Sequence, residues 1–123
     1  MLKTFALAAA VALCSAAPAW AESACQEPIA PAAVDGNTAT ADQLHMAVLD
    51  VKTFIKQSDD YQDCLWKELK DQQDAAKRDK KDLDPSAAQG VQDKVKSNQA
   101  LKERVGNEYN AAATTYKAKH PGS

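Results

Sequence analysis

Apolar side chains recur along two long segments at the three- and four-residue spacing that places them on one face of an α-helix. In residues 41–81 this stripe contains Leu44, Val48, Val51, Ile55, Ser58, Gln62, Leu65, Leu69 and Ala76, and it is broadened by Ala47, Phe54, Tyr61 and Trp66. In residues 85–119 it contains Ala88, Val91, Val95, Asn98, Lys102, Val105, Tyr109, Ala112 and Tyr116. The pattern therefore predicts two long amphipathic helices.

The residues at the ends of these segments are typical of helix termini. Thr40 and Gln43 have the spacing of a capping box, in which each side chain bonds the other residue's backbone N–H. Asp84 is a suitable N-cap for the second segment, and Pro85 suits its first helical position. The sequence His120-Pro121-Gly122 is expected to end that helix.

Two long helices joined by a few residues must lie antiparallel. We therefore predict an all-α fold, a long two-helix hairpin over residues 41–120 with the packing of a coiled coil. A turn near residue 83 sets the predicted facing pairs: Leu69 with Asn98, Leu65 with Lys102, Ile55 with Ala112, and Val51 with Tyr116. Lys102 is expected to extend its charged end out of this seam.

Residues 1–21 have the features of a secretory signal peptide. Lys3 precedes an apolar run, and Ala19-Trp20-Ala21 matches a small-x-small cleavage site. Cleavage after Ala21 would remove Cys14 and leave a single small domain in the periplasm or outside the cell. No later apolar run reaches the ~18 residues of a membrane span, so no membrane span is expected in the mature chain.

The two remaining cysteines, Cys25 and Cys64, are expected to form a disulfide, because exported proteins fold in an oxidising compartment. A metal-binding or catalytic thiol is the alternative. Neither histidine is close to a cysteine in the sequence, which favours the disulfide.

Residues 22–40 contain two prolines and a glycine without a helical period, and they predict an extended arm. From Thr40 to Cys64 the first helix rises by about 36 Å, and the residues from Cys25 to Thr40 span at most about 50 Å. The arm can therefore fold back and reach Cys64. We expect its Ile29 and Val34 to cover the face of the first helix opposite the stripe, where the sequence has Met46, Leu49 and Thr53.

The chain has 17 acidic and 15 basic residues, a net charge of −2, which argues against a nucleic-acid-binding protein. Few large apolar residues are available for a core, so we expect self-association or a protein partner. A basic run, Lys77–Lys81, is interleaved with aspartates near the hairpin tip. It complements the helix dipole, and docking on an anionic surface is its alternative role.

The sequence lacks a glycine-rich phosphate loop, a nucleophile elbow, a haem-attachment motif and a His-Glu-x-x-His motif. Asp59, Asp60 and Asp63 lie among lysines and are interpreted as a solvated helix face. We therefore expect a protein that is not an enzyme and has no cofactor.

One candidate ligand site involves His45, Met46 and His120 at the open end of the hairpin. Imidazole and thioether ligands suit copper, and a Met/His pair also ligates haem. Against this site, His45 and Met46 are consecutive and point about 100° apart on a helix. Two exposed histidines without a metal are the alternative.

Several short motifs give the chain a resemblance to known proteins: Cys25-x-x-Pro28, Asp35-Gly36, Tyr61-Gln62-x-Cys64-Leu65 and Val105-Gly106-x-Glu108-Tyr109. With these motifs the chain resembles a group of small uncharacterised exported bacterial proteins with a Cys-x-x-Pro start and a helical hairpin. The resemblance implies export and this fold, and it implies no activity and no functional residue.

Together these features predict a non-enzymatic periplasmic structural or protein-interaction module, with a chaperone-like role as one form of it. The alternative is a small-molecule, metal or haem binder at the open end of the hairpin.

Overall fold

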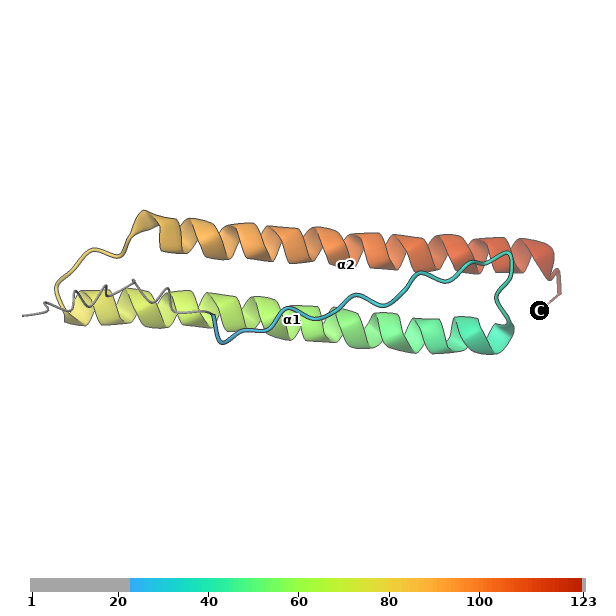
Figure 1. Ribbon diagram of the computed structural model, residues 1–123, viewed down its shortest axis with the longest axis horizontal. Helices are drawn as coiled ribbons and strands as arrows, with labels where there is room; N and C mark the ends of the chain where they lie inside the picture. Colours follow the sequence, from blue (N-terminus) through green and yellow to red (C-terminus); the bar gives the residue numbers. More distant parts are fainter. Residues whose placement is uncertain (1–22, 123) are drawn as a thin grey trace, which may run out of the picture.

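The computed structural model describes residues 23–122, and the predicted signal peptide lies outside them. Two helices, α1 (Ala41–Arg78) and α2 (Pro85–Lys119), pack side by side in opposite directions (Figure 1). No strand occurs among the described residues. The predicted all-α hairpin with an extended, disulfide-linked arm is confirmed.

Both predicted N-terminal caps are present. Thr40 Oγ1 accepts a 3.2 Å hydrogen bond from the Gln43 amide, and the Gln43 side chain accepts a 2.8 Å bond from the Thr40 amide. At the start of α2, Asp84 Oδ1 accepts a 2.9 Å bond from the Ser86 amide. These bonds satisfy amide groups that have no partner inside their helices.

Helix α1 ends at Arg78, three residues before the predicted position. Lys80 adopts a left-handed conformation with φ of 52°. The Lys81 amide then bonds the Ala76 carbonyl at 2.9 Å, and the Lys80 amide bonds the Lys77 carbonyl at 3.2 Å. This is the Schellman closure, which usually has glycine at the left-handed position and therefore gives little sequence signal when lysine occupies it.

The predicted register of the two helices is wrong. Asn98, predicted opposite Leu69, donates instead to Ser58 Oγ at 3.3 Å and accepts from Gln62 Nε2 at 2.9 Å. Ala112, predicted opposite Ile55, packs with Leu44. Leu69 and Ile55 each lie eleven residues beyond the observed partners Ser58 and Leu44.

The connection between the helices explains this shift. Residues 79–84 do not turn tightly. They run back along the hairpin, so that α2 begins farther from the tip than α1 ends (Figure 1). Eleven residues are about three helical turns, so the same stripe of each helix still faces the other. Lys102 is predicted to face Leu65. Its ammonium group instead forms an ion pair with the Asp59 carboxylate on α1.

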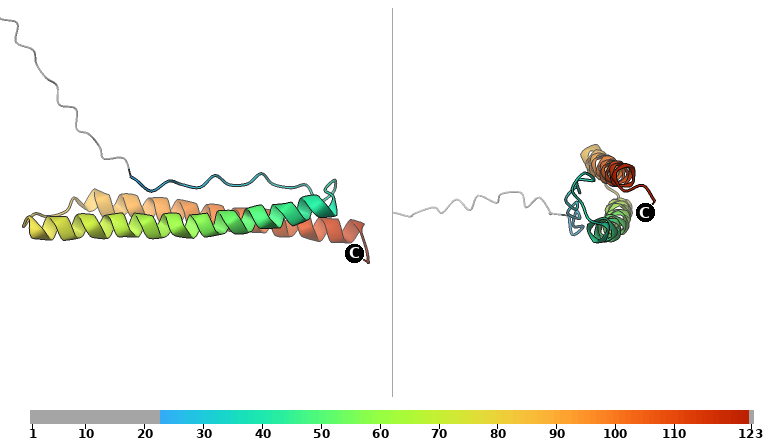
Figure 2. Two further views of the ribbon diagram at one scale, coloured as in Figure 1. Left: turned by 90° about the horizontal axis from the view of Figure 1, so that it is seen from below. Right: turned by 90° about the vertical axis from the view of Figure 1, so that its right-hand side faces the viewer.

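The arm lies along the groove between the two helices, which differs from the predicted position (Figure 2). The predicted covering of the opposite face of α1 is wrong, because Met46 and Leu49 are 56% and 42% exposed and Ile29 is 91% exposed. The groove offers the arm two apolar walls, whereas the opposite face offers one. Phe54 and Tyr61, predicted only to broaden the stripe, are buried.

A small apolar cluster closes the open end of the hairpin. It consists of Ala39, Leu44 and Ala112, with Val34, Tyr109 and Tyr116 packed against it. Gly36 lies directly on α2, where a Cβ atom on residue 36 would be 2.1 Å from the Ala112 carbonyl oxygen. Only glycine therefore allows the arm to approach α2 this closely.

Replacing Gly36 with Ala should lower the free energy of unfolding by about 1–3 kcal/mol, because the α2 backbone blocks the added methyl group. Gly106→Ala is the matched control. A Cβ atom at that helical position meets nothing, so this variant should gain about 1 kcal/mol. Urea unfolding followed by circular dichroism measures both, and two changes of the same sign would contradict the close packing of the arm.

Candidate functional site

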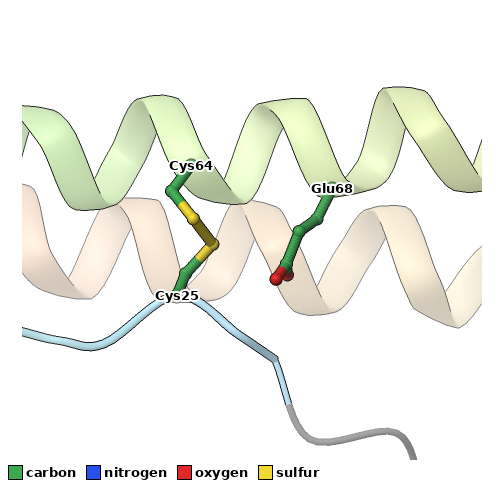
Figure 3. Close-up of side chains that lie close together, drawn as sticks. All are labelled: Cys25, Cys64 and Glu68. Carbon is green, nitrogen blue, oxygen red and sulfur yellow. A yellow bond between two sulfur atoms is a disulfide. The ribbon is translucent and has the colours of Figure 1, made fainter.

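A disulfide joins the arm to the middle of the hairpin (Figure 3). Cys25 on the arm and Cys64 on α1 are bonded through their sulfur atoms, with 5.7 Å between their Cα atoms. The pairing predicted from the sequence is therefore present. It closes a loop across 39 positions, which contains all but the beginning of the arm and the larger part of α1.

Glu68 reinforces this attachment one helical turn after Cys64. Its two carboxylate oxygens accept hydrogen bonds from Ser23 Oγ at 2.7 Å and from the Ala24 amide at 2.8 Å. Ser23 Oγ in turn accepts a 3.2 Å bond from the Cys25 amide. The beginning of the described arm is thus held by one covalent bond and a short hydrogen-bond network. Sequence reasoning missed Glu68, whose four-residue spacing from Cys64 was the available signal.

Among the described residues, Cys25, Cys64 and Glu68 are the only group of three or more His, Cys, Asp or Glu side chains that are close enough for a shared metal. Their ligand atoms lie within 4.8 Å of one another. The sulfur atoms are bonded to each other and are not thiolates, and metal ions bind thiolates. Both Glu68 oxygens accept bonds from the arm, so the group in this form is a structural attachment.

The arm and α1 form a groove of about 540 Å³ between them, which we call the arm–α1 groove. Its apolar part is made by alanines together with Val34 and Met46. Its carboxylates are Asp35 on the arm and Asp42 and Asp50 on α1, and no lysine or arginine lines it. The groove therefore combines an apolar floor with negative charge.

Asp35 shapes the turn at which the arm crosses to α2. Its Oδ1 atom accepts bonds from the Asn37 amide at 2.9 Å and from Asn37 Nδ2 at 3.0 Å. These bonds, the backbone one first, hold the pKa of Asp35 below its ordinary value of 3.8, and the charge of Lys119 adds to the effect. Asp35 is therefore ionised at neutral pH.

The predicted metal or haem ligands His45, Met46 and His120 are all exposed. Met46 lines the arm–α1 groove. The His120 ring stacks on Tyr116 with ring centroids 4.2 Å apart, and its Nδ1 atom lies 3.0 Å from the Tyr116 carbonyl oxygen. A site shared by the three residues stays a prediction.

Several charged residues of the hairpin surface pair locally. Lys56–Asp60, Lys67–Asp71 and Lys70–Asp74 are ion pairs one helical turn apart, at 2.5–2.7 Å. Pairs of this kind on an exposed helix contribute little to stability. The aspartates near residue 60 accordingly lie on a solvated face, and docking of the basic run Lys77–Lys81 on an anionic surface stays a prediction.

Removing the disulfide should reveal how strongly it restrains the unfolded chain. The double variant Cys25→Ser/Cys64→Ser is expected to lose about 4 kcal/mol of unfolding free energy, the chain-entropy value for a loop of this length. Urea unfolding of the oxidised parent and of the variant measures the loss. The reduced parent should match the variant, and equal stability of the variant and the oxidised parent would contradict the restraint.

The Asp35 turn should make stability depend on acid pH. Because the pKa of Asp35 is lower in the folded protein than its ordinary value, its contribution is fully present above about pH 4 and is lost as pH falls through the folded pKa. Asp35→Asn should therefore lose stability less steeply than the parent between pH 5 and pH 2. Thermal unfolding across this range tests it, with Asp82→Asn as a charge-matched control, and parallel pH profiles for the Asp35 variant and the parent would oppose it.

No protein-family model, curated protein or solved structure matches this chain. The resemblance to small exported proteins with a Cys-x-x-Pro start stays a prediction.

Proposed function

We propose that this chain is a non-enzymatic protein-interaction module that acts in the periplasm or outside the cell. The disulfide supports an oxidising compartment. Neither helix of the described residues combines the length and the hydropathy needed to cross a membrane.

The observation that carries the proposal is the arm–α1 groove. It is a surface with apolar side chains between the arm and α1, and the disulfide attaches the beginning of the arm, which forms one of its walls, to α1. Met46, at 56% exposure, presents a flexible thioether side chain to it. Methionine-rich or methionine-lined surfaces adapt to partners of different shape, which suits a binding or chaperone-like role.

The titrating groups support a non-enzymatic role. The pKa of Asp84 is lowered by the amide that it caps at Ser86, and the pKa values of Lys70 and Asp74 are shifted by their mutual ion pair. These shifts come from exposed local bonds. Tyr61 is the exception, because burial, together with the negative charges of Glu27 and Glu68, raises its pKa. Catalytic sites instead tend to shift pKa values through burial and converging charges in a cleft.

Self-association belongs to the same proposal. The described core contains few large side chains, and two of its fully buried residues, Ser58 and Asn98, are polar. Leu49 and Trp66 on α1 remain 42% and 43% exposed. A second copy that covers such surfaces would add apolar burial that one hairpin does not supply.

An aggregation assay tests the proposal. We expect the oxidised protein to slow the aggregation of a chemically unfolded client at equimolar ratio, whereas the Cys25→Ser/Cys64→Ser variant should protect less because its arm is released. Sedimentation velocity at several concentrations, alone and with the client, reports complexes and self-association. A protein that stays monomeric and leaves client aggregation unchanged would refute the proposed function.

A further inference from the structure

We propose that the arm–α1 groove binds an extended basic peptide segment of a partner protein, with the pattern basic–x–apolar–x–basic. This inference rests on the proposed interaction function and names the chemistry of the partner.

The three α1 residues that matter alternate in chemistry along one face. Asp42, Met46 and Asp50 follow each other at intervals of four residues, and all three line the groove. Their helical rise places Met46 about 6 Å, and Asp50 about 12 Å, beyond Asp42. In an extended peptide, side chains on one side recur about every 6.8 Å. A basic, an apolar and a second basic side chain at alternate positions therefore match the series.

The arm supplies an extended backbone for the same partner. Residues 32–34, the part of the arm that lines the groove before its turn, make no backbone or side-chain hydrogen bond within the described part of the chain. Ala32 and Ala33 are exposed and line the groove. An extended peptide that lies beside such a segment can bond its free amide and carbonyl groups, which is how strand-addition partners gain affinity. The side-chain pattern then supplies the specificity.

The negative charge of the groove favours a partner with positive charge. Asp35, Asp42 and Asp50 line it, and no lysine or arginine does so. Lys119 acts on Asp35 from the end of α2, which leaves the two α1 carboxylates as the principal contacts for basic side chains. Negative charge beside an apolar floor favours a basic amphipathic segment over an acidic one.

The probe is a fluorescein-labelled, acetylated and amidated peptide, Gly-Lys-Ser-Leu-Ser-Lys-Gly, measured by fluorescence anisotropy with the oxidised full-length protein at 20 mM NaCl. A peptide with Glu in place of both Lys, and one with the order Gly-Lys-Lys-Ser-Ser-Leu-Gly, are the comparison probes. We expect the first peptide to bind most tightly, and its affinity to fall as NaCl is raised to 200 mM because these charges are exposed.

Two double variants locate the binding. Asp42→Asn/Asp50→Asn should weaken binding about tenfold, because two partly exposed charge pairs are lost. Asp63→Asn/Asp82→Asn changes the net charge equally at exposed positions outside the groove, and it should change affinity by less than about twofold. Met46→Ser should also weaken binding, since it removes the apolar contact. Circular dichroism checks that all variants keep the helical content of the parent.

The inference is overturned if the first peptide does not bind, if the Glu or reordered peptide binds equally well, or if both double variants weaken binding alike. It is also overturned if the Asp42→Asn/Asp50→Asn variant changes self-association, measured by sedimentation, and leaves peptide binding unchanged. That result would indicate that a second copy occupies the groove. Failure of the peptide with retained protection of a client would reject this partner chemistry and leave the proposed function standing. If the parent protein does not slow the aggregation of the client, both the partner chemistry and the proposed function are rejected.

Discussion

The attachment of an extended arm to the groove between two helices determines the architecture of this protein. The arm has no hydrogen bonds of its own along residues 26–34, so its conformation must be fixed from its ends. The Cys25–Cys64 bond and Glu68 hold one end, and the close contact of Gly36 with α2 holds the other. Between these points the arm lies along the groove between the two helices, and Tyr61 borders a surface hollow together with arm residues 24–29.

The helices themselves are joined by a modest core in which polar residues take part. Ser58 and Asn98 are fully buried and bonded to each other, and Gln62 completes the set at the edge of the seam. No described buried side-chain polar atom lacks a partner. A polar layer of this kind disfavours other registers, since a displaced helix would bury these groups beside apolar residues. The layer thus fixes the alignment on which the arm and its groove depend.

The sequence was sufficient for the features that have a local or periodic signal. The helices, the capping box at Thr40, the Asp84 cap and the cysteine pairing follow from spacing and compartment. The register did not follow, because lysine rather than glycine closes α1 at position 80 and the connection then runs back along the hairpin. A shift of eleven residues also preserves the phase of both stripes, so periodicity cannot detect it. The position of the arm and its groove depends on tertiary contacts such as that of Gly36 with Ala112.

Nuclear Overhauser effects between the arm and the helices report where the arm lies. In the oxidised protein, we expect contacts from the Val34 methyl groups to the rings of Tyr109 and Tyr116, and from the Gly36 α-protons to Ala112 and Thr115. Contacts from Val34 and Ile29 to Leu49 and Thr53 would instead place the arm on the opposite face of α1, and they would exclude its attachment in the groove between the helices.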